Sequence, residues 1–506
     1  MTYSSGIASA FNKTKNRSSH LSPQSGMCSL CTEDCVGTCE IGLAATLGAK
    51  TVYPTTTGTN QVGSEKDYGI DYGHFNINGR VFGAIGTEET YEEATIFNVK
   101  LARTFGKDHL VKSTMPVFLP ALIKLNWADY FAGAAMAGIC CVIGEDARTK
   151  DPNLLMENGR VKEFPGLEEM QNAFKKHYRG YGQIALQCNV EDDMIGVPEV
   201  AIQQHGVEAI EFKFGQSAKG TQPANRLNTI EEAYAKKAQG YMVHPDPSDP
   251  AVIKAYEEGV CPNFYKYSRL PLWDEFYLKD RIDGLKKLGL KNVYFKMACY
   301  DSADVERVLR MASTIGVDMV TFDGAGGGSG YSPCKMMNEW GQPTLILENT
   351  VCNIVERMKK ESLWIPAITI TGGIVSEDQV FKALAYGQND ITTIGICRGA
   401  MAAAMTGKKV GQLIAEGNVP KHLQEYGETV EEIYGDLAEL RSFYGKDANN
   451  FPTGAIGVFS YLNKIAFGVR HFAALNRKFD VDCFDRNDLL PLTREAKDLL
   501  EGKWME

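Results

Sequence analysis

The sequence predicts an α/β protein built on a closed barrel of eight parallel strands, each followed by a helix, a (β/α)8 or TIM barrel. Two observations lead to this fold class. Short apolar runs recur along the middle of the chain, and longer amphipathic stretches separate them. Continuous apolar runs are typical of parallel strands buried on both faces, and eight such units in about 300 residues fit a closed barrel better than an open sheet.

The eight predicted strands lie in runs that begin at Thr114, Cys140, Gln183, Ala209, Asn292, Asp318, Pro366 and Ile391. The stretch after the sixth run has a helical period, because Ile346, Val351 and Ile354 fall near one face. An open doubly wound sheet that binds a dinucleotide is the structural alternative. It is disfavoured because the G-x-G-x-x-G fingerprint is missing after the first strand, and no P-loop is present either.

Composition changes along the chain and predicts four regions. We expect a flexible arm, an N-terminal cap region that holds a cysteine cluster, the barrel, and a helical C-terminal extension, at residues 1–27, 28–110, 111–410 and 411–506. The net charge is −10 and there is no basic block, which argues against binding to nucleic acid or to an anionic membrane. No apolar run reaches the ~18 residues that span a bilayer, and the N-terminus lacks a secretory apolar segment. We therefore expect a cytoplasmic, oligomeric protein.

Four of the 13 cysteines lie close together in a C-x2-C-x3-C-x3-C pattern, as Cys28, Cys31, Cys35 and Cys39. Four soft thiolates in one short loop suit an iron–sulfur cluster or zinc. Tight spacing favours iron–sulfur, with 4Fe–4S as the expected type, because structural zinc usually draws its ligands from two separated elements. Four free thiols in a flexible arm are the remaining possibility.

Barrel enzymes place their chemistry at the carboxyl ends of the strands. The residues that we assign to those ends, in chain order, are Met115, Pro116, Val117, Glu145, Gln187, Lys213, Gln216, Lys219, Lys296, Gly326, Gly327, Gly328, Ser329, Gly372, Gly373, Gly395, Arg398 and Gly399. They are few, and they occur where the apolar runs stop, as a ligand site in an apolar barrel requires.

The last two strand ends predict a phosphate site. Gly372 and Gly373 follow the seventh strand, while Gly395, Arg398 and Gly399 surround the end of the eighth. Glycines let backbone N–H groups approach a phosphate closely, and an arginine binds it through two parallel hydrogen bonds. The alternative is that these glycines simply end strands.

Two lysines, Lys213 and Lys296, close apolar strands. A buried ammonium group is costly without an anion, so both are expected to face a carboxylate, a phosphate or a reduced flavin. Either could instead form a structural ion pair with Glu145, Glu211 or Asp323. The amide of Gln187 suits the polar edge of a flavin ring, although it could equally satisfy backbone groups in the barrel.

Several of these segments resemble the FMN domain of glutamate synthases. FDGAGGGSGYSP at 322–333 is similar to that family's S-G-H-D-G-G-T-G-A-S-P, KFGQSAKG at 213–220 to K-I-x-Q-G-A-K-P, and VIGEDA at 142–147 to N-T-G-E-G-G. The stretch from Lys464 to Thr493 resembles the tail of stand-alone glutamate-synthase-like proteins. The similarity extends over about residues 110–490, with the segments in the same order.

The resemblance implies an FMN-dependent oxidoreductase that acts on an amino acid and 2-oxo acid pair. In that family a 2-oxo acid and ammonia form an imine, which reduced flavin converts to the amino acid; the reverse is also open. By resemblance, Glu145 handles protons, Gln216 and Lys219 bind substrate carboxylates, and Lys296 and Gln187 contact the flavin. Each role suits the chemistry of the side chain.

Three departures shape the expected partners. The chain starts without the family's Cys-nucleophile glutaminase domain, so free ammonia or a separate ammonia-supplying subunit is expected. The family's C-x5-C-x4-C cluster ligands are missing from 398–418, so the cluster at Cys28–Cys39 would accept electrons from a ferredoxin or a reductase subunit. The segment GTQPANRLN at 220–228 also differs from the family pattern, which leaves the 2-oxo acid open.

Three other functions compete with this reading. An FMN-dependent hydroxyacid oxidase or dehydrogenase would need a strand-end histidine as base, and none of the eight histidines lies at a predicted strand end. A non-catalytic redox-sensing subunit of a larger complex would carry the same cofactors. A metal-dependent barrel lyase is disfavoured, because no His/Asp/Glu set with metal spacing occurs at the strand ends.

Overall fold

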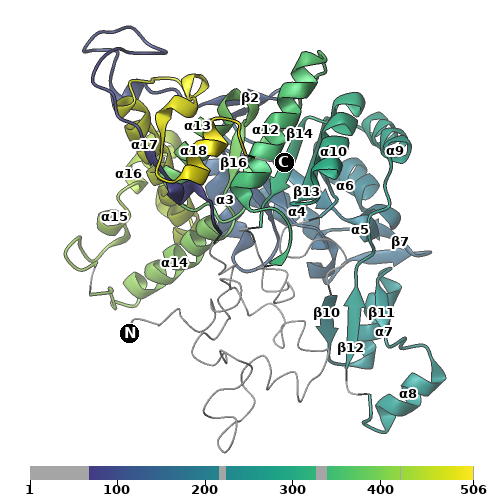
Figure 1. Ribbon diagram of the computed structural model, residues 1–506. Coiled ribbons are helices and arrows are strands. Elements are labelled where there is room, and N and C mark those ends of the chain that lie inside the picture. Colours follow the sequence, from purple (N-terminus) through teal and green to yellow (C-terminus); the bar gives the residue numbers. More distant parts are fainter. Residues whose placement is uncertain are drawn as a thin grey trace, which may run out of the picture.

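The computed structural model describes residues 68–215, 224–261, 263–325, 327, 339–421 and 423–504. Its centre is a closed barrel of eight parallel strands (Figure 1). Around the barrel the strands are β13 (Asn292–Ala298), β14 (Met319–Asp323), β15 (Ala367–Thr371), β16 (Thr393–Gly395), β4 (Val117–Leu122), β5 (Cys141–Ile143), β8 (Ile184–Cys188) and β9 (Ala209–Lys213). Each predicted run contains one of these strands, so the predicted fold class is confirmed.

Helices alternate with the strands and cover the outside of the barrel. They are α3 (Trp127–Ala137), α4 (Gly166–Lys175), α5 (Val190–Met194), α6 (Val197–His205), α9 (Glu275–Lys287), α10 (Ser302–Ile315), α12 (Thr344–Lys360), α13 (Glu377–Gly387) and α14 (Arg398–Ala415). α12 is the helix predicted after the sixth strand, and its Val351, Ile354 and Met358 are buried. The apolar face of each helix covers strand residues that point outward.

The interior of the barrel has an apolar half and a polar half. At the amino-terminal half the inward side chains form one apolar cluster, which includes Phe118, Cys140, Val142, Ala185, Ala209, Tyr294 and Met319. A hairpin of β2 (Arg103–Phe105) and β3 (Val111–Ser113) closes this end. Since side chains on one face of a strand recur every two residues, the next inward positions are Gln187, Glu211, Lys296 and Thr321. All four are buried.

A small inserted unit leaves the barrel after β9 and was not predicted. Its antiparallel sheet has the order β10 (Ala224–Leu227), β12 (Phe264–Tyr267) and β11 (Met242–His244), and its helices are α7 (Ile230–Ala238) and α8 (Pro250–Glu257). Leu227, Ile230, Ala233 and Phe264 form a separate apolar core. In Figure 1 the sheet extends from the barrel below α5 and β7 (Arg160–Glu163). β7 belongs to a short hairpin with β6 (Leu155–Glu157).

The chain after the barrel is mainly helical: α15 (Val430–Ile433), α16 (Leu437–Tyr444), α17 (Thr453–Leu475) and α18 (Arg494–Leu500). α17 packs closely on α14, because a Cβ atom at Gly407 would lie 2.6 Å from the Thr453 carbonyl oxygen. The extension also forms a two-stranded sheet, in which β17 (Leu489–Pro491) pairs antiparallel with β1 (Phe75–Ile77). The two ends of the described chain are therefore joined beside the barrel.

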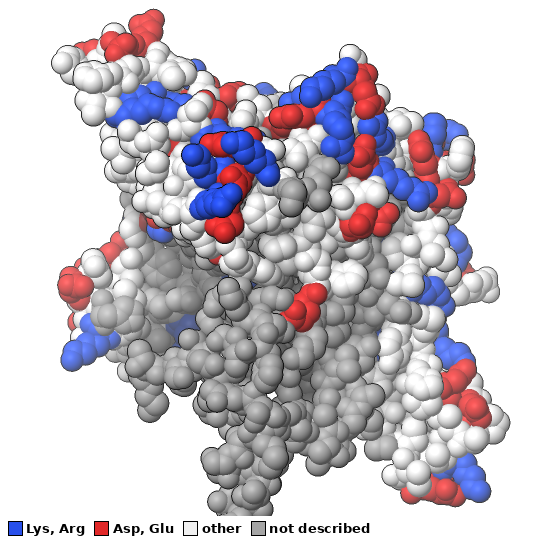
Figure 2. Space-filling view, in the orientation of Figure 1, with Lys and Arg blue, Asp and Glu red and all other residues white. Residues whose placement is uncertain are grey.

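The outer surface carries charges of both signs. On the face shown in Figure 2, Lys and Arg alternate with Asp and Glu over the helices. Arg310 of α10, for example, pairs with Glu306 on the same helix and with Glu361 at the end of α12. Such interleaved pairs produce no field of a single sign that would steer a polyanion to this face. Within the described ranges, no helix has the length and apolarity needed to cross a bilayer.

Candidate active site

A cavity opens at the carboxyl ends of β4, β14, β15 and β16. It is lined by Pro120, Ala121, Lys296, Asp323, Gly327, Thr371, Gly372, Gly373, Ile374, Val375, Gly395, Cys397 and Arg398. Six residues singled out from the sequence thus meet around one space: Lys296, Gly327, Gly372, Gly373, Gly395 and Arg398. They come from four separate strand ends, as in a barrel active site.

The glycines at these strand ends form a cradle whose backbone packs too closely against its neighbours to admit a side chain. Gly372 has φ +128°, and a Cβ atom there would lie 2.7 Å from the Gly324 carbonyl oxygen. At Gly395 it would lie 2.6 Å from Cβ of Thr371. α14 begins at Arg398, so the N–H groups of its first turn and the Arg398 side chain both border the cradle. This combination of backbone donors, helix N-terminus and arginine is suited to a phosphate.

Lys296 lies beneath the cavity between two carboxyl groups. Burial alone would lower the pKa of Lys296, but Asp323 on β14 and Glu211 on β9 outweigh it and raise the pKa above its ordinary value. Conversely, burial raises the pKa of Glu211, although Lys296 favours its charged form. The Gln187 amide also donates to Glu211 over 2.5 Å. The lysine is therefore a fixed cation at the mouth of the barrel.

Glu145 and Lys213 form an ion pair at the carboxyl ends of β5 and β9. Their side chains are 14% and 8% exposed, so the pair is largely buried. For Lys213 the structure therefore shows the alternative prediction, an ion pair with Glu145. A carboxyl group held beside an ammonium group in a restricted space has the composition of a proton-transfer site.

Three buried polar atoms in the upper half of the barrel lack a hydrogen-bond partner within the described part of the chain. They are Gln187 Oε1, Glu211 Oε2 and Thr321 Oγ1. β8, β9, β13 and β14 are consecutive in the barrel, so these atoms lie along one wall beneath the mouth. Buried polar atoms normally have partners, and these are therefore available to a ligand or to ordered water.

Some predicted site residues lie elsewhere. Met115, Pro116 and Val117 stand at the beginning of β4, so assigning them to a strand end was wrong. The apolar run is longer than the strand, and its second half supplies the carboxyl end with Pro120 and Ala121. Gly399 faces α17, where a Cβ atom would meet the Tyr461 hydroxyl group.

Other predicted residues fall outside the described residues, namely Gln216, Lys219, Gly326, Gly328, Ser329 and the four cysteines Cys28, Cys31, Cys35 and Cys39. Cys397 and Asp323 also line the cavity. Sequence reasoning placed Cys397 at the end of the eighth strand but gave it no site role, and it treated Asp323 only as a possible ion-pair partner. Asp323 ends the apolar run DMVTFD, so the strand-end rule could have assigned it to the site as well. Burial raises the pKa of the Cys397 thiol, which keeps it neutral.

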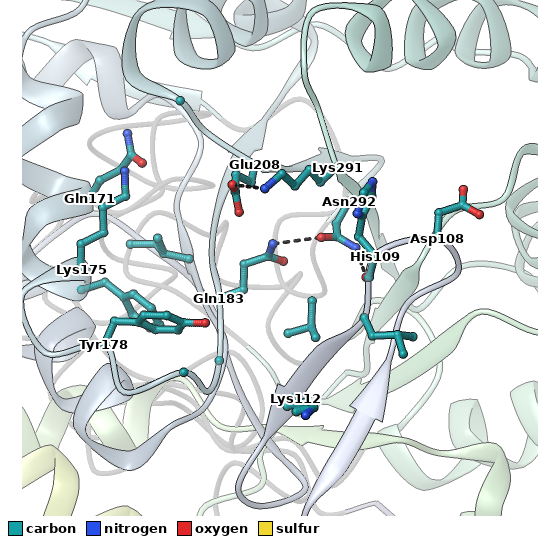
Figure 3. Close-up of a pocket in the computed structure, with 17 residues that line it drawn as sticks. Asp108, His109, Lys112, Gln171, Lys175, Tyr178, Gln183, Glu208, Lys291 and Asn292 are labelled. Atoms are coloured by element: carbon teal, nitrogen blue, oxygen red, sulfur yellow. Dashed lines mark hydrogen bonds and ion pairs between the residues drawn. The ribbon is translucent and has the colours of Figure 1, made fainter. Parts of the chain in front are cut away.

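A second cavity of about 670 Å³ lies at the opposite, amino-terminal end of the barrel (Figure 3). Its polar lining residues are Asp108, His109, Lys112, Gln171, Lys175, Tyr178, Gln183, Glu208, Lys291 and Asn292. Gln183 donates to Asn292 over 3.0 Å, and Lys291 pairs with Glu208. Asn292 in turn donates to the carbonyl oxygen of His109. These groups bind one another, which is typical of the structural end of a barrel.

Comparison with known protein families gives a match to a segment in the middle of the chain. Residues 270–407 match the family described as the conserved region in glutamate synthase. This segment is similar to that conserved region. It contains Lys296 and Asp323 as well as the glycines of the cradle, so the family region and the cavity coincide.

Two solved structures are among those similar to this chain. The flavin-binding domain of baker's yeast flavocytochrome b2 has 12% identity, covers 86% of this chain and 82% of its own, and has a TM-score of 0.45. A mutant of an active chimera of (S)-mandelate dehydrogenase has 12% identity, coverages of 83% and 88%, and a TM-score of 0.43. A search of curated proteins finds no significant sequence match.

Proposed function

We propose that the protein is an FMN-dependent oxidoreductase of the glutamate synthase type, acting on an amino acid and 2-oxo acid pair. The observation that carries this proposal is the cavity at the strand ends, where the glycine cradle, the start of α14 and the Lys296 cation face one space. The family match over 270–407 covers most of the same residues.

The residues fit FMN in three respects. The glycine cradle and Arg398 would hold the phosphate. Lys296 would lie near the edge of the ring, where a cation stabilises the negative charge of the reduced form. Gln187 Oε1 and Thr321 Oγ1 are buried polar atoms without partners in the described ranges, and they would bind polar groups of the ligand directly or through water. FMN, when bound, supplies the two electrons of the reaction as a hydride.

The chain's own groups would supply binding and proton transfer. A 2-oxo acid and ammonia condense to an imine with loss of water, and hydride addition at the imine carbon yields the amino acid. A substrate carboxylate that reaches Lys213 would compete with Glu145 for the ammonium group. Release from that ion pair would leave the Glu145 carboxyl group beside the reacting nitrogen, where it can exchange a proton. In the reverse direction the same group would accept the proton.

We also propose that Cys28, Cys31, Cys35 and Cys39 bind an iron–sulfur cluster that links the flavin to a one-electron donor. A ferredoxin or a reductase subunit would be that donor, and ammonia would come from solution or from a separate subunit. The support is the spacing of the four thiols. Among the residues that the structure describes, no group of three or more His, Cys, Asp or Glu is placed to hold a metal.

Histidine positions favour this proposal over a hydroxyacid oxidase. None of the histidines in the described ranges ends a barrel strand; His244, for example, ends β11 of the inserted sheet. A strand-end carboxyl group, Glu145, is present instead. One variant distinguishes this proposal from a non-catalytic redox-sensing subunit. In such a subunit, Glu145→Gln would leave the turnover of the whole complex unchanged.

The deciding experiment is anaerobic flavin spectroscopy of the full-length protein. The bound flavin is reduced, and 2-oxo acids are added singly with and without ammonium. We expect reoxidation to require both a 2-oxo acid and ammonium, and L-amino acids to bleach the oxidised flavin in the reverse direction. Bleaching by 2-hydroxy acids would favour the oxidase. A protein that binds no flavin, or whose flavin responds to no amino or oxo acid, would overturn the proposal.

A further inference from the structure

The residue after Glu145 has an unusual environment. Asp146 adopts the left-handed conformation, with φ 62° and ψ 15°, although it is not a glycine. Its carboxylate accepts hydrogen bonds from Asn189 over 2.9 Å and from Arg148 over 3.2 Å. The Asp146 N–H group donates to Asp192 over 3.1 Å. The loop that carries Glu145 is thereby fixed to the segment after β8.

The same carboxylate also binds the inserted unit. The Tyr241 hydroxyl group donates to Oδ1 of Asp146, and Lys266 Nζ lies 3.3 Å from Oδ2. Tyr241 immediately precedes β11 and Lys266 lies within β12, so one side chain joins two strands of the insert to the barrel. Burial would raise the pKa of Asp146, but Lys266 and Arg148 outweigh it and hold the pKa well below its ordinary value.

The groups around Asp146 make the contact between the insert and the barrel rigid. Arg148 is fully buried and pairs with Asp192 as well as Asp146. The Tyr241 ring lies between two cations, with Lys266 Nζ 3.7 Å and the Arg148 guanidinium 5.1 Å from its centroid. A buried network in which each charge is paired resists rearrangement, because breaking one pair leaves the partner charge buried and uncompensated.

We propose that Asp146 is a positioning residue that couples the inserted sheet to the Glu145–Lys213 pair. The inference rests on the proposed function, in which Glu145 exchanges the substrate proton. Glu145 is one peptide bond from Asp146, and Lys213 is the last residue of β9, from which the insert departs. The insert and the loop that carries the acid are therefore fixed to each other on both sides of the mouth, and the insert sets the position of the Glu145 carboxyl group.

The test is Asp146→Asn with Asp318→Asn as its control. Asparagine tolerates the left-handed conformation and keeps the volume, so the first change removes only the charge. Asp318 is more deeply buried, at 3% exposure against 22% for the Asp146 side chain, and it accepts two backbone hydrogen bonds, from Lys107 and Val293, at the amino-terminal end of β14. It therefore reports the general cost of neutralising a buried aspartate away from the mouth.

We expect hydrogen exchange of the β11 and β12 amides to accelerate at least tenfold in Asp146→Asn and to stay unchanged in Asp318→Asn. With FMN bound, kcat should fall about tenfold, the limb of the pH–rate profile assigned to Glu145 should shift, and FMN affinity should not change. Among the described residues, Lys213, Glu211 and Lys296 are charged groups that interact with Glu145, and both variants leave them in place. Tyr241→Phe, which removes one hydroxyl group, should change exchange and kcat in the same direction by a smaller factor.

Two results would overturn the coupling: exchange in the insert that matches the Asp318→Asn control, or a pH–rate profile identical to that of the wild type. The exchange measurement needs no turnover. A wild-type protein that is inactive toward every amino and oxo acid would therefore refute the proposed function, whereas the exchange data would still decide whether Asp146 holds the insert.

Discussion

Gln183 immediately precedes β8 and Gln187 lies within it. The two side chains are four residues apart on the same face of the strand, yet their surroundings differ. The Gln183 amide at the amino-terminal end is fully engaged: it donates to Asn292 and accepts from the Tyr294 hydroxyl group. The Gln187 amide donates to Glu211, but its buried Oε1 lacks a partner within the described residues. The lower end of the barrel satisfies its own polar groups, while the upper end retains capacity for a ligand.

The largest expected difference between the two ends is in turnover. Lys296→Met at the mouth removes the cation between Asp323 and Glu211, and we expect kcat to fall about 10²- to 10³-fold, as for the loss of one group that stabilises developing charge. Lys291→Met at the start of β13 breaks only a half-exposed ion pair with Glu208 and should change kcat less than about twofold. Steady-state rates at saturating substrate measure both. Equal effects would contradict the division into a chemical and a structural end.

Substitution of two glycines with positive φ, Gly372 and Gly206, should have different effects on FMN affinity. Gly372→Ala places a Cβ atom 2.7 Å from the Gly324 carbonyl oxygen, so the backbone of the cradle must shift, and we expect FMN to bind about 10- to 100-fold more weakly through loss of charge-assisted hydrogen bonds. Gly206→Ala at the lower cavity has φ +60° and open space around its Cβ atom, so it should cost stability without changing FMN affinity. Titration of apoprotein with FMN, followed by fluorescence, measures the two dissociation constants. Unchanged binding in Gly372→Ala would place the phosphate elsewhere.

A buried carboxyl group outside both ends should affect only stability. Burial raises the pKa of Glu348 on α12 to about 8, although its hydrogen bond from Tyr72 acts in the opposite direction. Because the folded-state pKa exceeds the unfolded value of about 4.3, the protonated group's contribution is complete below about pH 4.3 and is lost as pH rises through about 8. Ionisation of this group should therefore lower the wild type's free energy of unfolding by about 2 kcal/mol between pH 6 and pH 9. Glu348→Gln should not show this loss.

Denaturant unfolding at the two pH values measures this difference. Glu356→Gln on the exposed face of the same helix is the control and should unfold as the wild type does. An identical pH dependence in Glu348→Gln would show that this carboxyl group does not bind the extra proton.

The smallest expected effect belongs to the floor of the lower cavity. Asn292→Ala leaves the Gln183 amide and the His109 carbonyl oxygen without their partner, which should lower the free energy of unfolding by about 1 kcal/mol, since water can enter from the cavity. FMN affinity and kcat should match the wild type. Urea unfolding and steady-state kinetics test both halves of this expectation, and a loss of turnover greater than the loss of stability would give the lower end a functional role.

Sequence patterns were most informative where burial is continuous. All eight strands were found because a strand buried on both faces must be apolar along its length, and the glycines after β15 and β16 follow from the need for backbone close to a ligand. The inserted sheet was missed because its strands are three or four residues long and half-exposed, so they carry little apolar signal. Met115 was misassigned because an apolar run marks a strand without marking which of its residues end it.

The order of apolar runs by itself determined that the chain forms a barrel, and the glycines predicted a phosphate site at its mouth, because burial and backbone conformation are properties of local sequence. Only the tertiary structure decided that Glu145 pairs with Lys213, that Lys296 lies between Asp323 and Glu211, and that Asp146 holds the insert. Those pairings depend on strand register around the closed barrel, which brings together side chains from distant parts of the chain. The residue type determines which chemistry a side chain can perform, but the fold determines which other side chain it contacts.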